Sequence, residues 1–172
     1  LLRGTESDIL RDGALDYPDD ILERFDVIIA SIHSRYKLDS DGMTKRVITA
    51  MNNPLFKIWG HPLGRLVQRR PPIECRMEEI LDVVAESSAA VEISGDPKRL
   101  DLEPRWIKEA RKRGIKFVIS TDAHSISDLY NLKFGIGIAR RGGVRRGEVL
   151  NVLGVREFQR SVKPTGLEPA VS

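Results

Sequence analysis

Residues 27–33 read Val27-Ile28-Ile29-Ala30-Ser31-Ile32-His33, a nearly continuous apolar run that ends on a histidine. Strands with one wet face alternate apolar and polar residues, whereas continuous runs are typical of strands buried on both faces, as in parallel sheets. Other short runs rich in Ile, Val and Phe share this character, and they cover Leu2–Ile9, Phe56–Gly60, Ala90–Ile93 and Lys116–Ser120. The sequence therefore predicts a largely parallel sheet that contains these five strands.

Helical patterns lie between the predicted strands. The clearest is Arg76–Ser88, which places its apolar side chains on one stripe and its acids on the opposite face. Glu103–Arg113 ends at Gly114, a usual residue just after a helix. Further helices are expected at Pro18–Phe25 and Asp41–Asn53. Because strands and helices alternate along the chain, the sequence predicts the α/β class.

The composition is that of an ordinary globular protein. The chain has 172 residues, of which 41% are hydrophobic and 31% charged, enough for one domain with a core. No apolar run approaches the roughly 20 residues needed to span a bilayer. The single cysteine, Cys75, cannot form an internal disulfide, which fits a reducing cytoplasm. We therefore expect a cytoplasmic location.

The two ends of the chain differ from the rest. The sequence opens on Leu1 without a starting Met, which we interpret as a cut inside a longer protein. Lys163–Ser172 contains two prolines and one glycine and shows no periodicity. We therefore expect one domain over residues 1–162, followed by a disordered or non-native tail.

Basic residues occur in two clusters, although the formal net charge of +3 is too small to indicate nucleic-acid binding by itself. One cluster holds Arg65, Arg69 and Arg70, and the other holds Arg140, Arg141, Arg145 and Arg146. Such clusters can bind phosphates. Solvated surface arginines explain each cluster equally well, so both interpretations stay open.

All three histidines follow predicted strands. His33 follows Val27–Ile32, His61 follows Phe56–Gly60, and His124 follows Lys116–Ser120 with Asp122 two residues before it. The carboxyl ends of parallel strands meet at one edge of a sheet, where the loops converge on a common crevice. One such histidine is usually structural, but three at the same edge indicate a functional site.

Acidic residues accompany these histidines. Asp122-Ala123-His124 sends an oxygen ligand and an imidazole from one loop, and Zn, Mn and Fe accept such mixed sets. A capping Asp beside a surface His explains the same motif when it stands alone. Glu6 lies inside the first predicted strand, where a carboxylate must be exposed, paired or metal-bound.

Six motifs in this order resemble the polymerase-and-histidinol-phosphatase (PHP) family, and most closely the PHP domain fused to bacterial and archaeal X-family DNA polymerases. The resemblance covers residues 4–162. The motifs are Gly4-Thr5-Glu6-Ser7-Asp8-Ile9-Leu10, Ala30-Ser31-Ile32-His33-Ser34, Gly60-His61-Pro62-Leu63-Gly64-Arg65, Val91-Glu92-Ile93-Ser94, Ser120-Thr121-Asp122-Ala123-His124-Ser125 and Gly137-Ile138-Ala139-Arg140-Arg141-Gly142.

This resemblance implies a distorted, TIM-like (β/α)7 barrel with up to three divalent metal ions, Mn or Zn, at its C-terminal face. Glu6 would bridge two ions, His33 and His61 would join it on one, Asp122 would share the other, and His124 would serve the third. The implied chemistry is metal-assisted hydrolysis of phosphate esters. In polymerase-linked members it appears as 3′-to-5′ exonuclease and 3′-end processing activity, with DNA 3′ ends and an upstream polymerase domain of the same parent chain as partners.

Two arginines are candidates for holding substrate phosphates, because a guanidinium pairs bidentately with them. They are Arg65 and Arg140, and surface salt bridges are an equally good interpretation of both. The family's first histidine motif and its next histidine-bearing strand are absent and would lie upstream of Leu1. We therefore expect a barrel that lacks its first strands, binds at most one metal tightly and is inactive by itself.

Three functions remain open at this point. The first is the DNA 3′-end nuclease domain of an X-family polymerase. The second is a free-standing PHP phosphatase acting on a small phosphate ester such as histidinol phosphate. The third is a non-catalytic domain that supports a polymerase structurally, which loss of several metal ligands would mark.

Overall fold

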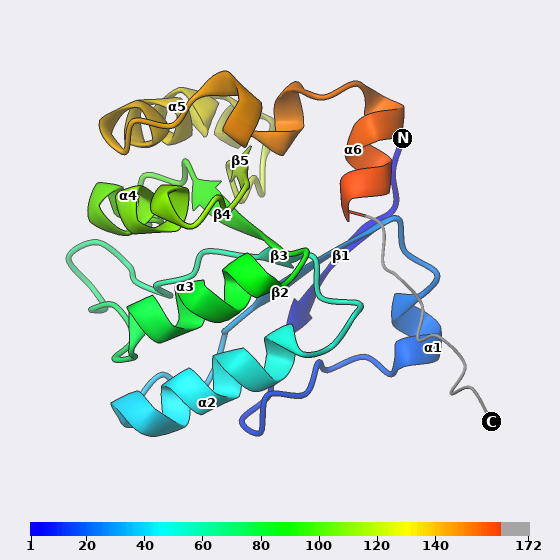
Figure 1. The fold of residues 1–172 in the computed structure, drawn as a ribbon. Coiled ribbons are helices and arrows are strands. Elements are labelled where there is room, and N and C mark those ends of the chain that lie inside the picture. The colour runs from blue at the N-terminus through cyan, green and yellow to red at the C-terminus, as the bar shows by residue number, and fades with distance from the viewer. Residues whose placement is uncertain (163–172) are drawn as a thin grey trace.

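The strands of the computed structural model, which describes residues 1–162, form one parallel sheet (Figure 1). Neighbours in the sheet are also neighbours in sequence, in the order β1-β2-β3-β4-β5. Every pair is parallel, as the apolar runs predict. The strands are β1 (Gly4–Asp8), β2 (Val27–Ser31), β3 (Ile58–Trp59), β4 (Ala90–Ser94) and β5 (Phe117–Ser120).

Helices connect successive strands and cover the sheet. Helices α2, α3, α4 and α5 stack in sequence along one side of it, each in contact with the next (Figure 1). Short 3-10 turns η1, η2 and η3 flank α5. The helices are α1 (Asp19–Leu22), α2 (Ser40–Met51), α3 (Met77–Glu86), α4 (Pro104–Lys112), α5 (Leu132–Arg141) and α6 (Val155–Val162), and the turns are η1 (Ile126–Asn131), η2 (Arg146–Glu148) and η3 (Leu150–Val152).

The core has a layer on each face of the sheet. The larger cluster joins Ile28, Trp59 and Val91 to the apolar stripes of the stacked helices. A smaller cluster on other residues of the strands joins Ile58 and Val118 to α6 and the segment before it. Burial on both faces explains why the strand sequences are continuous apolar runs rather than alternating ones.

The outer edge of β5 is covered by the segment that follows α5. Val149 forms a parallel bridge with Phe117. Two residues later, the Asn151 side chain accepts a hydrogen bond from the Ile119 amide at 2.7 Å and donates one to the Ile119 carbonyl at 3.0 Å. The amide side chain therefore takes the place of a strand partner. Within residues 1–162 no strand pairs with the outer edge of β1, so closure into a seven-stranded barrel stays a prediction.

Two helices were not predicted from the sequence, namely α5 and α6. Helix α5 contains Gly135 and Gly137, which lower helix propensity and hide the pattern. Gly135 is needed because a Cβ there would lie 2.8 Å from Ile119 Cγ2 and 3.4 Å from the Gly95 backbone. Tertiary packing therefore overrides local propensity at this position.

The four expected helices and five expected strands all exist, with ends that differ from the prediction by at most three residues, and β3 is reduced to two residues. Among the residues that the structure describes, no helix is long and apolar enough to cross a membrane. The expected tail, Lys163–Ser172, lies outside the described residues.

Candidate metal site

Three of the predicted metal ligands converge on one point. Glu6 lies in β1, His33 two residues after β2, and His61 two residues after β3. Glu6 Oε1 lies 3.0 Å from His61 Nε2 and 3.4 Å from His33 Nε2. The two Nε2 atoms lie 3.2 Å apart. The order of the first three strands therefore brings together residues that span 56 positions of the chain.

The spacing of these atoms fits a divalent cation. Ligand atoms about 2.1 Å from one tetrahedral ion stand about 3.4 Å from each other, close to the separations found here. Each residue offers one ligand atom, and these atoms lie within 4.8 Å of one another. Two imidazole nitrogens and a carboxylate oxygen form a mixed set that Zn and Mn accept. This cluster is therefore suited to hold a divalent metal ion.

Close packing between β2 and β3 fixes the position of His61 in the cluster. A Cβ at Gly60 would lie 2.7 Å from Ile29 Cγ2 and even closer to Ser31 Oγ, so only glycine fits there. His61 itself has φ of +26°, a conformation that costs a residue with a side chain and is found at functional sites. Its side chain is only 2% exposed. The chain therefore turns sharply after β3 and buries the imidazole against Glu6.

Asp8 orients the second imidazole, a role that the sequence analysis missed. Its carboxylate hydrogen-bonds to His33 Nδ1, which leaves Nε2 to face Glu6. Carboxylate partners of this kind fix the tautomer and orientation of metal-binding histidines. The available signal was spacing, because residues 6 and 8 of one strand point to the same face.

Electrostatics couple the cluster tightly. The hydrogen bond with Glu6, reinforced by Asp8, raises the pKa of His33 to about 9 against the opposing effect of burial. Burial pushes the pKa of Glu6 upward, but hydrogen bonds from His33 and His61 outweigh it and lower that pKa well below its ordinary value. Glu6 is therefore an anion that is held in place by hydrogen-bond donors and is available to a cation.

Glu92 in β4 links the ends of two neighbouring strands, and its role was also missed. It is 5% exposed, and burial raises the pKa of its carboxyl. It accepts hydrogen bonds from the His61 backbone amide, at 2.5 Å, and from the Ser120 hydroxyl. A carboxylate inside the otherwise apolar run of β4 was the available signal. Glu92 holds the turn at His61 in register with the end of β5.

Asp122 and His124 lie at the same edge of the sheet, after β5, but outside this cluster. Asp122 adopts a left-handed backbone, with φ of +49°, and its Oδ2 accepts a hydrogen bond from Arg99 Nε at 3.0 Å. His124 is 83% exposed, and its Nδ1 lies 2.7 Å from the Asp122 carbonyl oxygen. Both line a cavity of about 570 Å³ together with Lys98 and Arg99. A metal-binding role for this pair stays a prediction.

The two candidate phosphate-binding arginines are placed differently from each other. Arg65 pairs with Glu103 and donates to the carbonyl oxygens of Arg99 and Leu100, so its guanidinium is engaged in holding the loop before α4. Arg140 is exposed in the last turn of α5. Helix α5 begins beside Gly95 at the end of β4, so Arg140 lies toward the opposite end of the sheet. The structure brings neither arginine to the Glu6 cluster.

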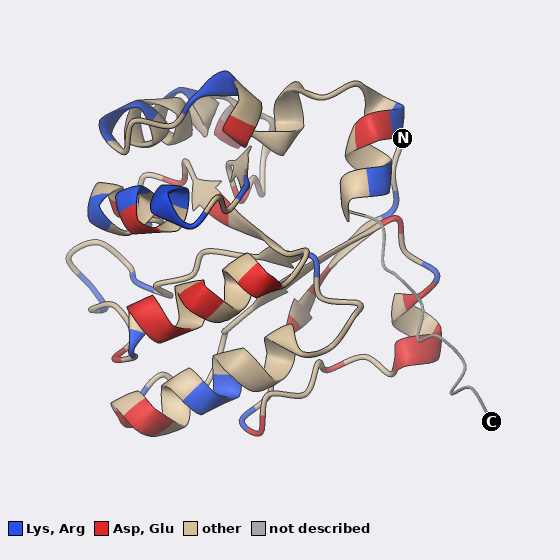
Figure 2. Cartoon of the chain, in the orientation of Figure 1, with Lys and Arg blue, Asp and Glu red and all other residues tan. Residues whose placement is uncertain are grey.

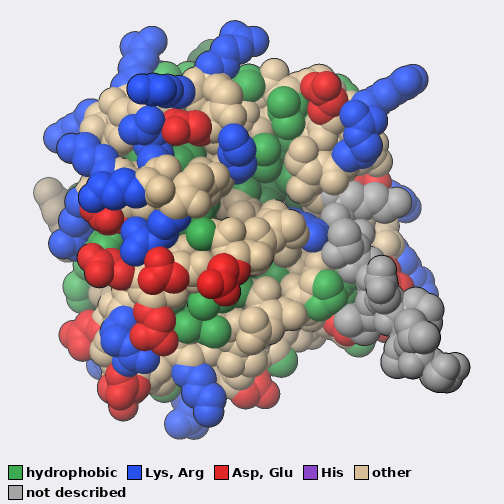
Figure 3. All heavy atoms as spheres, viewed as in Figure 1, with side chains coloured by type: hydrophobic (Ala, Val, Ile, Leu, Met, Phe, Trp, Pro, Cys, Tyr) green, Lys and Arg blue, Asp and Glu red, His purple; other side chains and the backbone are tan. Residues whose placement is uncertain are grey.

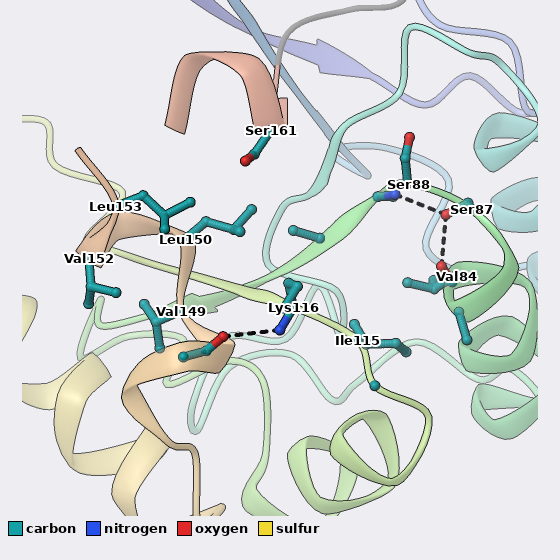
Figure 4. A pocket seen from close by; sticks show the side chains of 15 residues that line it. Val84, Ser87, Ser88, Ile115, Lys116, Val149, Leu150, Val152, Leu153 and Ser161 are labelled. Carbon is teal, nitrogen blue, oxygen red and sulfur yellow. Dashed lines mark hydrogen bonds between the residues drawn. The ribbon is translucent and has the colours of Figure 1, made fainter. Parts of the chain in front are cut away.

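A cavity of about 470 Å³ lies at the other end of the sheet, away from every candidate ligand. Its walls are the starts of β4 and β5, the end of α3 and the segment around Val149 (Figure 4). Lys116 donates a hydrogen bond to the Gly147 carbonyl at 3.0 Å on one side of it (Figure 4). We place the functional site at the carboxyl edge because the candidate ligands converge there.

Comparisons with known proteins find relatives that are named as a polymerase with exonuclease activity and as probable phosphatases. The chain is 37% identical over 163 residues to the DNA polymerase/3'-5' exonuclease PolX of Bacillus subtilis, an alignment that covers 95% of this chain and 29% of that protein. It is 30% identical over 161 residues to a probable phosphatase of Thermoanaerobacter sp. (strain X514), covering 88% of this chain and 63% of the relative. A scan against models of protein families finds no match.

Other proteins similar to this chain are also named as probable phosphatases. A probable phosphatase of Clostridium acetobutylicum is 30% identical over 133 residues, which cover 72% of this chain and 52% of that protein. The chain thus spans less than a third of the polymerase relative and roughly half to two-thirds of the phosphatases. The similarity agrees with the resemblance to a PHP-type domain that the six motifs indicate.

Proposed function

We propose that this chain is a divalent-metal-dependent hydrolase domain acting on phosphate esters. The observation that carries the proposal is the convergence of Glu6, His33 and His61 at the carboxyl ends of three adjacent parallel strands. Relatives named as phosphatases and as an exonuclease support the same chemistry, because both names describe hydrolysis of phosphate esters.

The residues of the chain have separable roles in this proposal. A bound divalent ion polarises the phosphoryl group and lowers the pKa of a water molecule. Glu6, His33 and His61 would hold that ion. Asp8 keeps His33 in the tautomer that presents Nε2 to it. Glu92 anchors the backbone of His61, so the main chain that carries the imidazole cannot shift without breaking a buried hydrogen bond.

The finer proposal is 3′-to-5′ processing of DNA ends within an X-family DNA polymerase. The higher identity to the polymerase relative, over nearly the whole chain, supports it. DNA 3′ ends and a polymerase domain in the same parent chain would then be the partners, in the cytoplasm, with up to three Mn or Zn ions. In that case Asp122 and His124 would contribute to further metal positions.

A small phosphate ester is the second candidate substrate, favoured by the relatives named as phosphatases. A purely structural role is third, because the candidate ligands in this chain are all present. The two substrates make different demands on the surface, since a small ester needs only the pocket and DNA needs a cationic path for its backbone.

The test measures metal binding and hydrolysis in the same preparations. We expect the chain to bind a divalent ion, and His61→Ala to lose it. Any hydrolysis of bis(p-nitrophenyl) phosphate or of a 3′-labelled oligonucleotide should disappear in chelator and in Glu6→Gln. Hydrolysis that persists in chelator, or a wild-type chain that takes up neither Zn nor Mn, would contradict the proposal.

A further inference from the structure

Basic residues are concentrated on one part of the outer layer of helices. Residues 104–116 and 140–148 carry ten basic and two acidic side chains, a net charge of +8, whereas the whole chain has a formal net charge of +3, so all other residues together are at −5. Figure 3 shows Lys and Arg side chains gathered over α4 and α5, with acidic side chains below them over α3. The charge is therefore segregated rather than mixed.

Helix α4 presents an ordered stripe of this charge. Arg105, Lys108 and Lys112 stand at i, i+3 and i+7, so they lie along one face, and all three are exposed. Figure 2 shows several Lys and Arg positions along α4. The buried residues of α4, Ile107 and Ala110, lie on another face. The stripe is thus a feature of the outer surface rather than of the core.

The end of α5 continues the stripe. A Cβ at Gly142 would lie 2.7 Å from Ile107 Cβ, and one at Gly143 would lie 3.0 Å from Arg111 Nη1, so this turn rests directly on α4. The turn carries Arg140 and Arg141 before the two glycines and Arg146 after them. All three arginines are exposed, and within residues 1–162 none of their guanidinium groups forms a hydrogen bond or ion pair.

The basic surface, defined by Arg105, Lys108, Lys112, Arg140, Arg141 and Arg146, starts at the edge of the sheet that holds the candidate metal site. Helix α4 begins just after Asp101, which bonds to the end of β4, and runs away from that edge for nine residues. Nine helical residues span about 13 Å. One DNA strand rises about 3.4 Å per nucleotide, so this length matches several successive phosphates.

Local stabilisation accounts for only part of this arrangement. Basic residues in the last turn of a helix interact favourably with its dipole, which explains Lys112, Arg140 and Arg141. It does not explain Lys108 in the middle of α4 or Arg146 beyond α5. The ion pairs of Arg105 with Glu103 and of Lys112 with Glu109 are exposed, so these cations can exchange partners at little cost.

We propose that the basic surface binds the phosphate backbone of DNA without sequence preference and leads the strand toward the candidate metal site. The proposal rests on the proposed function and selects DNA over a small phosphate ester, because a small ester cannot reach from the site to the end of α5. Arg140 then contacts DNA far from the reacting phosphate.

The experiment measures binding of a short fluorescein-labelled DNA duplex to the 172-residue chain by anisotropy, over a series of salt concentrations and with chelator present. Two charge-neutralised variants are compared with wild type, Lys108→Gln/Lys112→Gln on α4 and Arg141→Gln/Arg146→Gln beyond it. The matched control is Arg156→Gln/Arg160→Gln, which removes the same charge from exposed positions on α6. Thermal melts establish that each variant is folded.

We expect each surface variant to bind about tenfold more weakly at low salt and to lose about 1.8 from the slope of log affinity against log salt, while the control stays within about twofold of wild type. Equal losses in the control and the surface variants would overturn the proposal, as would no binding by wild type at low salt. Stronger competition by anionic phosphatidylserine vesicles than by unlabelled DNA would also overturn it, in favour of a membrane surface.

Chelator separates this test from that of the proposed function. DNA binding by the basic surface needs no metal, so it can succeed when hydrolysis is absent. Conversely, all variants could show equal metal-dependent hydrolysis of bis(p-nitrophenyl) phosphate and unchanged DNA binding. That result would support the proposed function and rule out DNA binding by the basic surface.

Discussion

The Nε2 atoms of His33 and His61 lie 3.2 Å apart although the residues are separated by 28 positions in sequence. Their rings meet edge to face, at an interplanar angle of 68°, so both nitrogens point at Glu6 rather than stacking. The pKa of His33 is raised to about 9, which places a proton among these atoms near neutral pH. A divalent cation would replace that proton and satisfy both nitrogens and the carboxylate together.

Removal of one imidazole should abolish this site. We expect His61→Ala to weaken Zn or Mn binding by more than the roughly 10–100-fold typical of losing an outer partner, because a direct ligand is lost. Tyr130→Ala is the control, since Tyr130 is 76% exposed and is not among the candidate ligands. Calorimetric metal titration checks both variants. Equal metal affinity in wild type and His61→Ala would show that the ion binds elsewhere.

The orientation of His33 should matter almost as much as its presence. Asp8→Asn keeps an oxygen near His33 Nδ1 but removes the charge that favours the donating tautomer. We expect about 10–100-fold weaker metal binding without loss of the fold. Asp20→Asn, which makes the same change at an exposed position of α1, should leave the affinity unaltered. An Asp8→Asn chain that binds metal like wild type would remove Asp8 from the site.

The sequence predicts the sheet well because burial on both faces leaves a strong local signal. The runs at Val27–Ile32 and Ala90–Ile93 become β2 and β4 almost unchanged. Helix α5 leaves no such signal, since the close approach of Gly135 to Gly95 is a tertiary constraint that appears locally only as a helix-breaking residue. The order of the strands is likewise a property of packing that periodicity does not carry.

The candidate site was predicted unevenly for a similar reason. Histidines at strand ends are visible in sequence, and two of the three do meet Glu6. Asp8 and Glu92 act through neighbours 25 and 31 residues away, so their roles depend on strand register. Asp122 and His124 share the edge with the cluster, but a loop's exact direction depends on contacts such as Arg99 with Asp122, which no spacing rule gives.

Close packing of β2 on β3 gives a stability prediction at Gly60. A methyl group there meets Ile29 Cγ2 at 2.7 Å and the Ser31 hydroxyl, so Gly60→Ala should lower the free energy of unfolding by about 1–3 kcal/mol. Gly137→Ala in α5 is the control, because nothing lies within 4 Å of its Cβ position. That change should stabilise by about 0.5–1 kcal/mol through helix propensity. Urea denaturation in chelator compares them, and a Gly60→Ala chain as stable as wild type would disprove the tight contact.

The stability of the fold should depend on pH through the buried carboxyl of Asp101. The residue is fully buried, its Oδ2 accepts the Leu63 amide at 2.9 Å, and its Oδ1 has no partner among the described residues. Burial raises the pKa of this carboxyl from 3.8 to about 7, and the nearby Glu92 adds to the effect. The native state therefore holds the Asp101 proton more tightly than the unfolded chain does, and its stabilising contribution is complete below about pH 4 and lost as the pH rises to about 7.

Asp101→Asn removes this ionisation and keeps an oxygen for the Leu63 amide. A pKa difference of about three means that ionisation of Asp101 lowers the stability of the wild-type chain by about 4 kcal/mol above pH 7. The variant avoids this loss, but its buried amide group lacks a full set of hydrogen-bond partners, which costs about 1–3 kcal/mol. We therefore expect the variant to be more stable than wild type at pH 8 by about 1–3 kcal/mol and no more stable at pH 4.5. Urea denaturation at the two pH values, with chelator present, measures the difference. A stability difference that is the same at both values would mean that Asp101 does not titrate between them.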